Sequence, residues 1–260
     1  MLKKLTPIAV ALAALGSVPA HAISDGELDG NRHPYVGLMV ALDAAGNLLW
    51  RCSGTLLSSR LYLTAGHCTE SPAASAEIWF DADVESGIPQ NGYPFDGPAQ
   101  GKTYTHPNYD PNAFFLFDLG VVVLDKPVKM KAYGSLPQLD EIDRMVNQRG
   151  QQDVTFTAVG YGLQAINPVH VESLRVRMFA TPKLNQINTG FTGTQSLLLS
   201  NNHSTGGTCF GDSGGPNFIG SSTVVGGVTS FGINGNCAGT GGVFRMDRQN
   251  VLDFVKGYLH

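Results

Sequence analysis

Three side chains in separate parts of the sequence have the types needed for nucleophilic hydrolysis. His67 lies in the run Leu-Thr-Ala-Gly-His-Cys, Asp118 heads an apolar run, and Ser213 lies in Gly-Asp-Ser-Gly-Gly-Pro. A serine hydroxyl becomes an effective nucleophile when a base takes its proton and an anion orients and stabilises the protonated base. The glycines around Ser213 leave its backbone free to expose the hydroxyl and to direct N–H groups at an oxyanion. These residues therefore predict hydrolysis of an acyl bond.

Each of these residues also has a purely structural interpretation. His67 could be a hydrogen-bonded histidine at the end of a strand, Asp118 a turn cap and Ser213 an ordinary loop serine. Asp110 lies near Asp118 and is a rival acid, but only Asp118 is next to the apolar run. Because all three types occur together, each in a tight local context, we favour the catalytic interpretation.

The segment around Ser213 also matches the Gly-x-Ser-x-Gly turn of the α/β-hydrolase fold. In that fold the acid and then the histidine follow the serine, on a mostly parallel sheet. Only 47 residues follow Ser213, His260 is their sole histidine, and they show no alternation of strands with helices. We therefore reject this alternative.

The elements that must position these side chains are predicted to be strands. Of the 260 residues, 42% are hydrophobic and 15% are charged, which excludes a disordered or coiled-coil protein. The 32 glycines favour turns, and apolar or β-branched runs occur at 36–42, 61–65, 76–80, 120–124, 154–159, 174–180, 196–200, 223–231 and 242–246. This series predicts antiparallel sandwiches or barrels. Helical spacing appears near the C-terminus, with Asp247 as a candidate N-cap.

The first 22 residues have the pattern of a secretory signal peptide. Two lysines precede an apolar stretch that is too short to span a bilayer, and Ala-His-Ala follows as a cleavage site. The alternative is an uncleaved membrane anchor. We expect cleavage after Ala22, a mature chain that begins at Ile23, and export to the periplasm or the medium. The short leader has a bacterial appearance.

Export changes the interpretation of the four cysteines, Cys52, Cys68, Cys209 and Cys237. In an oxidising compartment they fit two disulfides. Three pairings are possible, and pairing in sequence order would close two local loops. A zinc site is the alternative, but the sequence has no Cys-x-x-Cys pair.

The charge balance excludes one class of partner. With 17 Lys and Arg against 21 Asp and Glu, the formal net charge is −4. We do not expect a chain with no basic excess to bind nucleic acid, since phosphate neutralisation by Lys and Arg supplies most of the affinity of such binding. After residue 22, no run is long and apolar enough to predict a membrane span.

Taken together, the motifs resemble the chymotrypsin/trypsin family of serine proteases. Residues 52–57 and 64–68 resemble the first disulfide loop of that family, and 209–216 resemble its nucleophile loop. Residues 160–162 are Gly-Tyr-Gly where the family has Gly-Trp-Gly, and 230–232 resemble its substrate-binding strand. The resemblance runs from Ile23 to the C-terminus.

The resemblance implies an all-β fold of two antiparallel six-stranded β-barrels with a C-terminal α-helix. The expected parts are an N-terminal barrel at 23–137, a C-terminal barrel at 138–246 and a helix at 247–260. It implies a secreted serine endopeptidase that acts on proteins or peptides, without cofactor or metal, as a monomer that binds neither nucleic acid nor membrane. The alternative is a catalytically silent relative that serves as a binding or adhesion module.

The resemblance also assigns a role to each residue of the site. His67 would be the general base, Asp118 would orient it, and Ser213 would attack the substrate. The N–H groups of Gly211 and Ser213 would form the oxyanion hole, and Ser230 would add a hydrogen bond to Asp118.

Activation in this family depends on a new N-terminal Ile or Val whose ammonium pairs with the acid before the nucleophile. Ile23 directly follows the expected signal cleavage, and Asp212 is the acid before Ser213. We therefore expect signal peptidase itself to expose the activating terminus. The alternative is that Ile23 is coincidental and that another group holds Asp212.

The specificity pocket is expected to favour bulky apolar or aromatic residues. Its base would be Gly207, followed by Thr208, where trypsin-like enzymes have an aspartate. Residues 214–246 contain no acid that could balance a buried Lys or Arg of the substrate. Phe244 would line the depth of the pocket. The expected substrate-binding residues are Gly207, Thr208, Ser230, Phe231, Gly232 and Gly242.

A cluster of acids lies where some relatives bind calcium, although a solvated acidic loop is the favoured interpretation. The cluster consists of Glu70, Glu77, Asp81, Asp83 and Glu85.

Overall fold

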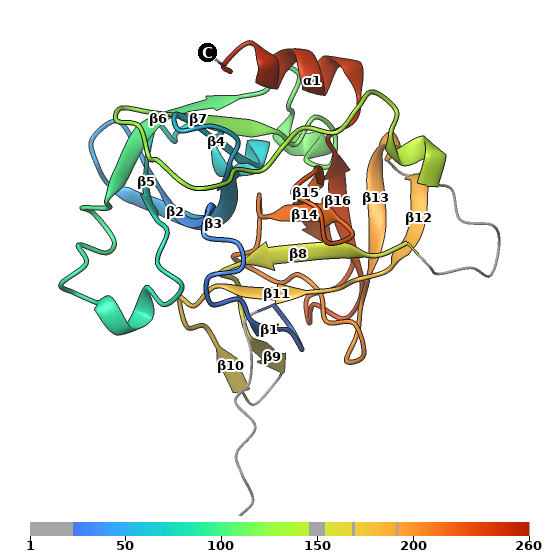
Figure 1. Cartoon of the computed structure of the whole chain (residues 1–260), viewed down its shortest axis with the longest axis horizontal. Coiled ribbons are helices and arrows are strands. Elements are labelled where there is room, and N and C mark those ends of the chain that lie inside the picture. The colour runs from blue at the N-terminus through green and yellow to red at the C-terminus, as the bar shows by residue number, and fades with distance from the viewer. Residues whose placement is uncertain (1–22, 146–153, 168–169, 191, 260) are drawn as a thin grey trace, which may run out of the picture.

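The computed structural model describes residues 23–145, 154–167, 170–190 and 192–259 (Figure 1). The expected signal peptide, residues 1–22, lies outside them. Apart from four short 3₁₀ turns and one C-terminal α-helix, the regular secondary structure of the described chain is all β-strand. No helix within it is both long and apolar enough to cross a membrane. The predicted all-β fold class is confirmed.

Six antiparallel strands close into a barrel in the N-terminal half. Their order around the barrel is β2 (Val36–Leu42), β3 (Leu48–Leu56), β4 (Leu61–Thr64), β7 (Gly120–Leu124), β6 (Ala99–Thr105) and β5 (Ser75–Trp79). All seven residues of β2 are buried, and Tyr62 and Trp79 are fully buried in the same core. The β2–β3 hairpin turns at Asp43, whose Oδ1 accepts the N–H groups of Ala45 and Asn47, both at 2.8 Å.

The C-terminal half forms an open, half-barrel sheet of eight strands. Their order is β1 (Glu27–Leu28), β11 (Met178–Ala180), β8 (Phe156–Gly160), β14 (Pro216–Ile219), β15 (Val225–Gly232), β16 (Gly239–Arg245), β13 (Gly193–Asn201) and β12 (Leu184–Thr189). The expected second barrel was a closed one of six strands. This sheet is open because its two end strands, β1 and β12, do not pair with each other. The N-terminal β1 therefore belongs to the second sheet rather than to the closed barrel.

The remaining elements are short. β9 (Ala165–Asn167) and β10 (His170–Glu172) form a separate hairpin. The 3₁₀ turns are Gly66–Cys68, Glu85–Gly87, Pro111–Ala113 and Ile142–Met145.

The cysteines pair in sequence order. Cys52 is bonded to Cys68 and Cys209 to Cys237, so the described chain has no free cysteine. The first disulfide ties β3 to the turn that carries His67, and the second closes the segment between the nucleophile loop and β16. Each disulfide therefore braces a segment beside the candidate site.

The C-terminal helix α1 (Gln249–Lys256) lies beside β6 and β7 (Figure 1). Val251, Leu252 and Val255 face the protein and are buried. Asp247 is not its N-cap, because Arg248 occupies that position.

The carboxylate of Asp247 instead binds the fully buried Arg245, with the Nε and Nη2 atoms at 2.9 and 2.8 Å. A buried guanidinium is costly without an anion, which explains why Asp247 turns inward rather than towards the helix end.

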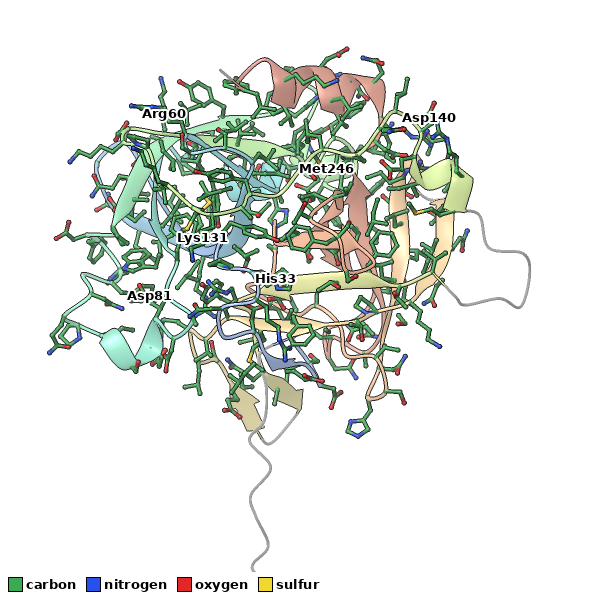
Figure 2. The ribbon with its side chains drawn as sticks, viewed as in Figure 1. His33, Arg60, Asp81, Lys131, Asp140 and Met246 are labelled. Carbon is green, nitrogen blue, oxygen red and sulfur yellow. A yellow bond between two sulfur atoms is a disulfide. The ribbon has the colours of Figure 1, made fainter. Side chains whose placement is uncertain are left out.

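A buried polar network joins the two sheets. The fully buried Arg177 donates from Nε to Asp29 at 2.9 Å, and from Nη1 to the Val36 carbonyl and the Tyr161 hydroxyl, both at 3.0 Å. Asp29 also accepts the N–H of His33, which is labelled in Figure 2 and whose ring stacks on that of Phe218 in β14. Tyr161 thus uses its hydroxyl where the resembled family has tryptophan.

Candidate active site

His67 is positioned by the pairing of β4 with β7. The two strands align Thr64 with Gly120, so that the turn after β4 meets the residues just before β7. The His67 N–H donates to Asp118 Oδ1 at 2.9 Å. Its Nδ1 lies 2.9 Å from Asp118 Oδ2 and 3.1 Å from Oδ1. The structure therefore brings together two of the predicted residues, and Nε2 of His67 faces away from Asp118.

Asp118 is fully buried and receives a further donor from the second sheet. The Ser230 hydroxyl on β15 donates to Asp118 Oδ2 at 2.5 Å, the contact expected from the resemblance. The alternative acid, Asp110, caps a 3₁₀ turn instead: its Oδ1 accepts the N–H of Asn112 at 2.8 Å. Of the two acids considered, only Asp118 contacts His67.

The surroundings of His67 favour its protonated form. Burial lowers the pKa of His67, but the charge of Asp118, the hydrogen bond to Asp118 and the charge of Glu70 outweigh burial and raise the pKa above its ordinary value. A base of this kind holds a proton well enough to pass it on during acyl transfer.

Ser213 lies in the loop before β14 and is held against the closed barrel. Its carbonyl accepts the N–H of Ser53 on β3 at 2.8 Å. The next residue, Gly214, donates to the Thr229 carbonyl at 2.8 Å. Within the described residues, no hydrogen bond joins the Ser213 hydroxyl to the His67 ring. Such contacts are often long in free enzymes and tighten when substrate binds.

The backbone before Ser213 leaves two N–H groups open. Gly211 has φ +96°, a conformation that favours glycine. The Phe210 carbonyl accepts the N–H of Leu163 at 2.8 Å, and the Gly211 carbonyl accepts the Ser53 hydroxyl at 2.9 Å. Neither the Gly211 N–H nor the Ser213 N–H has an acceptor among the described residues. Both predicted oxyanion-hole donors are therefore available to a ligand.

Ile23 and Asp212, the two residues of the ion pair expected after cleavage, are both fully buried. Asp212 accepts the N–H of Gly162 at 2.8 Å and that of Cys209 at 2.9 Å. Ile23 still follows residue 22 here and so has no α-ammonium; its side chain packs among apolar residues that include Ala158. Burial raises the pKa of Asp212 to about 7, against the lowering effect of those two hydrogen bonds and of the Arg51 charge.

A cavity of about 380 Å³ lies next to Ser213. Four of the expected substrate-binding residues line it, namely Thr208, Ser230, Phe231 and Gly232. None of its lining residues carries a charge.

Gly207, Gly242 and Phe244 are placed differently from expectation. A side chain on Gly207 would collide with Asn201, so Gly207 faces away from the cavity. The Phe231 ring covers Gly242, and Phe244 is fully buried in the core rather than lining the cavity.

Six lining residues were not among the predicted site residues, namely Phe114, Phe210, Thr229, Ile233, Asn234 and Gly235. Phe210 could have been predicted, because it directly precedes Gly211 of the expected oxyanion hole. Phe114 could not, since its place depends on how the loop before Asp118 folds over β15, where its ring lies 6.2 Å from that of Phe231.

The described residues offer poor ligands for a metal at this site. His67 lies close to Cys52 and Cys68, but their sulfur atoms are joined in a disulfide. Two of the acids noted in the sequence have protein partners, since Glu77 accepts the N–H of Gly97 at 2.9 Å and Glu85 binds Arg175 at 2.6 Å.

Comparison of the chain with known proteins shows the family to which it belongs. The trypsin family model, described as "Trypsin", matches residues 28–255. Trypsin 5G1 of Aedes aegypti is 29% identical, over 85% of this chain and 79% of its own length. The chymotrypsin of Phaedon cochleariae is 28% identical, over 81% and 72%. Serine protease Hayan of Drosophila melanogaster is 25% identical over 91% of this chain, which spans 39% of that protein. These relatives are insect proteins and do not support the expected bacterial origin.

Two solved structures share the fold. HL collagenase superposes with a TM-score of 0.68 at 17% identity, covering 91% of this chain and 98% of that one. Human heparin binding protein gives 0.64 at 18% identity, covering 91% and 96%. Since the family model spans nearly all of the described residues and the fold agrees with it, the chain belongs to the trypsin family of serine proteases.

Proposed function

We propose that the protein is a secreted serine endopeptidase that cleaves peptide bonds through an acyl-enzyme. The observation that carries this proposal is the buried Asp118 bound to Nδ1 of His67, beside a cavity lined by Ser213. Membership of the protease family implies protein substrates.

In the proposed reaction the Ser213 Oγ attacks the scissile carbonyl carbon while Nε2 of His67 takes the hydroxyl proton. The carbonyl oxygen gains the negative charge, and the N–H groups of Gly211 and Ser213 donate to it. When the tetrahedral intermediate collapses, the C–N bond breaks and His67 gives its proton to the leaving amine. A water molecule then attacks the acyl-enzyme, with His67 again as base, and releases the acid product and Ser213.

Asp118 supports this cycle through the tautomer of His67. With the carboxylate at Nδ1, that nitrogen carries the proton and Nε2 keeps a free lone pair for the serine hydroxyl. The hydrogen bond from Ser230 satisfies part of the hydrogen-bonding capacity of the buried carboxylate.

The cavity supports a preference for bulky apolar or aromatic side chains of the substrate. Phe114, Phe231 and Ile233 supply apolar surface, and no lining acid would balance a buried Lys or Arg. Thr208 and Ser230 are the polar groups at hand for orientation.

We also propose that removal of residues 1–22 activates the enzyme. Cleavage would give Ile23 an α-ammonium, and the buried Asp212 lacks a salt-bridge partner among the described residues. Pairing the two would offset the cost of burying this carboxylate. The processed enzyme is expected to be a monomer outside the cell that needs no cofactor, and binds neither nucleic acid nor membranes.

Covalent labelling tests the proposed function. A chain beginning at Ile23 is treated with a peptidyl diphenyl phosphonate carrying a phenylalanine-like side chain, and the mass of the protein is measured. We expect one adduct per chain, which Ser213→Ala abolishes. Ser221→Ala, at an exposed turn, is the matched control and should label normally. A folded chain that neither labels nor cleaves casein would instead be the silent binding module.

A further inference from the structure

Ser53 is a fully buried polar residue of β3 that no assigned role explains. Its hydroxyl donates to the Gly211 carbonyl at 2.9 Å and accepts the N–H of Tyr161, also at 2.9 Å. A buried hydroxyl with both a donor and an acceptor partner has a fixed orientation. The side chain therefore links the loop before the nucleophile to the segment after β8.

The backbone of Ser53 makes two more contacts in the same region. Its N–H donates to the Ser213 carbonyl at 2.8 Å, and its carbonyl accepts the hydroxyl of Thr64 at 2.8 Å. Thr64 is the last residue of β4, just before the turn that holds His67. One residue thus contacts the nucleophile, the loop of the proposed oxyanion hole and the strand that carries the proposed base.

We propose that Ser53 is a positioning residue that holds the oxyanion hole in its working geometry, an inference that rests on the proposed function. The two N–H groups of that hole belong to peptide planes on either side of Gly211 and Asp212. The first plane is held at the Phe210 carbonyl by Leu163, and the second at the Asp212 carbonyl by Gly215, both at 2.8 Å. Between them lies Gly211, whose backbone has the most rotational freedom of any residue type. The Ser53 hydroxyl fixes the Gly211 carbonyl and so limits that rotation.

The contact does not need the Ile23 ammonium. It is present while Ile23 still follows residue 22 and while Asp212 is held by backbone N–H groups alone. Ser53 therefore stabilises the loop independently of the proposed activation step.

The packing around Ser53 leaves no room for a larger residue. A Cβ on Gly160 would lie 3.1 Å from the Ser53 hydroxyl, and one on Gly215 would lie 3.2 Å from its Cβ. Both backbones approach this side chain closely, so the informative substitutions make it smaller.

The test compares Ser53→Ala with a matched control in the chain beginning at Ile23. Thr55→Val removes another fully buried hydroxyl from β3, one that contacts the Tyr35 carbonyl at 3.4 Å and no residue of the site. We expect Ser53→Ala to lower kcat by roughly 10- to 100-fold with little change in KM, because a lost oxyanion-hole donor costs about 10²–10³ in kcat and a misplaced one costs less. Thr55→Val should leave kcat near that of the parent.

A second readout separates positioning from general destabilisation. A peptide boronate forms a tetrahedral adduct with the serine, so its inhibition constant should rise in Ser53→Ala by a factor similar to the loss in kcat. If Ser53→Ala does not fold, Ser53→Gly replaces it and should show the same split between kcat and KM. An active parent whose Ser53 variants keep its kcat, or lose it no more than Thr55→Val does, overturns the inference. An inactive, unlabelled parent would overturn the proposed function instead.

Discussion

The buried carboxylate of Asp118 accepts hydrogen bonds from three donors, which offset the cost of burying it. The His67 ring and backbone supply two and Ser230 supplies the third. An isolated buried carboxylate is costly, whereas hydrogen-bond donors offset part of that cost. Burial lowers the pKa of His67, but the charge of Asp118 and its hydrogen bond raise it above the ordinary value.

This arrangement predicts the acid limb of the pH profile. Activity needs neutral His67, so kcat/KM should fall as the pH drops through a pKa above the ordinary value of about 6.5. Glu70→Gln removes a charge that raises this pKa and should move the limb to lower pH. The profile is measured with a peptide anilide from pH 5 to 9. Glu27→Gln, on the exposed β1, is the control, and a limb that Glu70→Gln leaves in place would contradict the assignment.

At the scale of elements, the cavity beside Ser213 is lined by the end of β15, the segment that follows it and the loop that carries Ser213. The pairing of β15 with β16 sets Phe231 opposite Gly242 and Gly232 opposite Gly241. A Cβ on Gly241 would lie 3.2 Å from the Thr208 hydroxyl, which places Gly241 against the side chain of Thr208. The cavity is lined by aromatic, aliphatic and small polar residues, with no charged group.

These walls predict the order of reactivity of small substrates. Peptide anilides with Phe or Leu before the scissile bond should have a higher kcat/KM than the matched Arg anilide. The physical reason is that an arginine buried in this cavity would lose its hydration without gaining an ion pair. Initial rates on the three anilides with a common peptide leader provide the measurement, and a clear preference for Arg would show that the cavity binds a cation.

At the scale of the whole molecule, the site exists only where the two sheets meet. His67 and Asp118 come from the closed barrel, whereas Ser213 and Ser230 come from the second sheet. The Arg177 network crosses this junction and joins residues on both sides of it. The buried Asp212 lies close to the same junction, since Cβ atoms on Gly160 or Gly162 would press on its carboxylate.

Asp212 predicts how processing changes the pH dependence of stability. In the unprocessed chain its pKa is about 7, above the ordinary 3.8, so the unfolded state releases its proton at lower pH. The free energy of unfolding should therefore fall as the pH rises from about 4 to 7, by on the order of 4 kcal/mol. A chain that begins at Ile23 should lose less, because the ammonium pairs with the ionised carboxylate.

Urea unfolding with intact disulfides, at pH values from 4 to 7, measures this difference between chains with and without one alanine before Ile23. Equal pH dependence in the two chains would contradict the pairing. N-terminal sequencing of exported protein tests the cleavage site directly. A chain that starts at a residue other than Ile23 would contradict the proposed activation by signal-peptide removal.

The sequence anticipated much of the fold because strand signals are local. Each of the nine predicted runs overlaps a strand, and two of them, 36–42 and 120–124, coincide with β2 and β7. β3 was not predicted, since Arg51, Ser53 and Thr55 make it look polar. Those residues are accommodated in a strand because distant partners, such as Ser173, Gly211 and Tyr35, accept their hydrogen bonds.

Residue types and short motifs were sufficient to recognise the family and to name a candidate nucleophile, base and acid, because each motif consists of residues that are consecutive in the chain. The tertiary structure alone decided that Gly207 faces Asn201, that Asp247 binds Arg245 and that Ser53 holds Gly211. Each of these outcomes depends on which buried polar group finds a partner from a distant strand. The local sequence does not record that choice, since it is made only when the two sheets pack together.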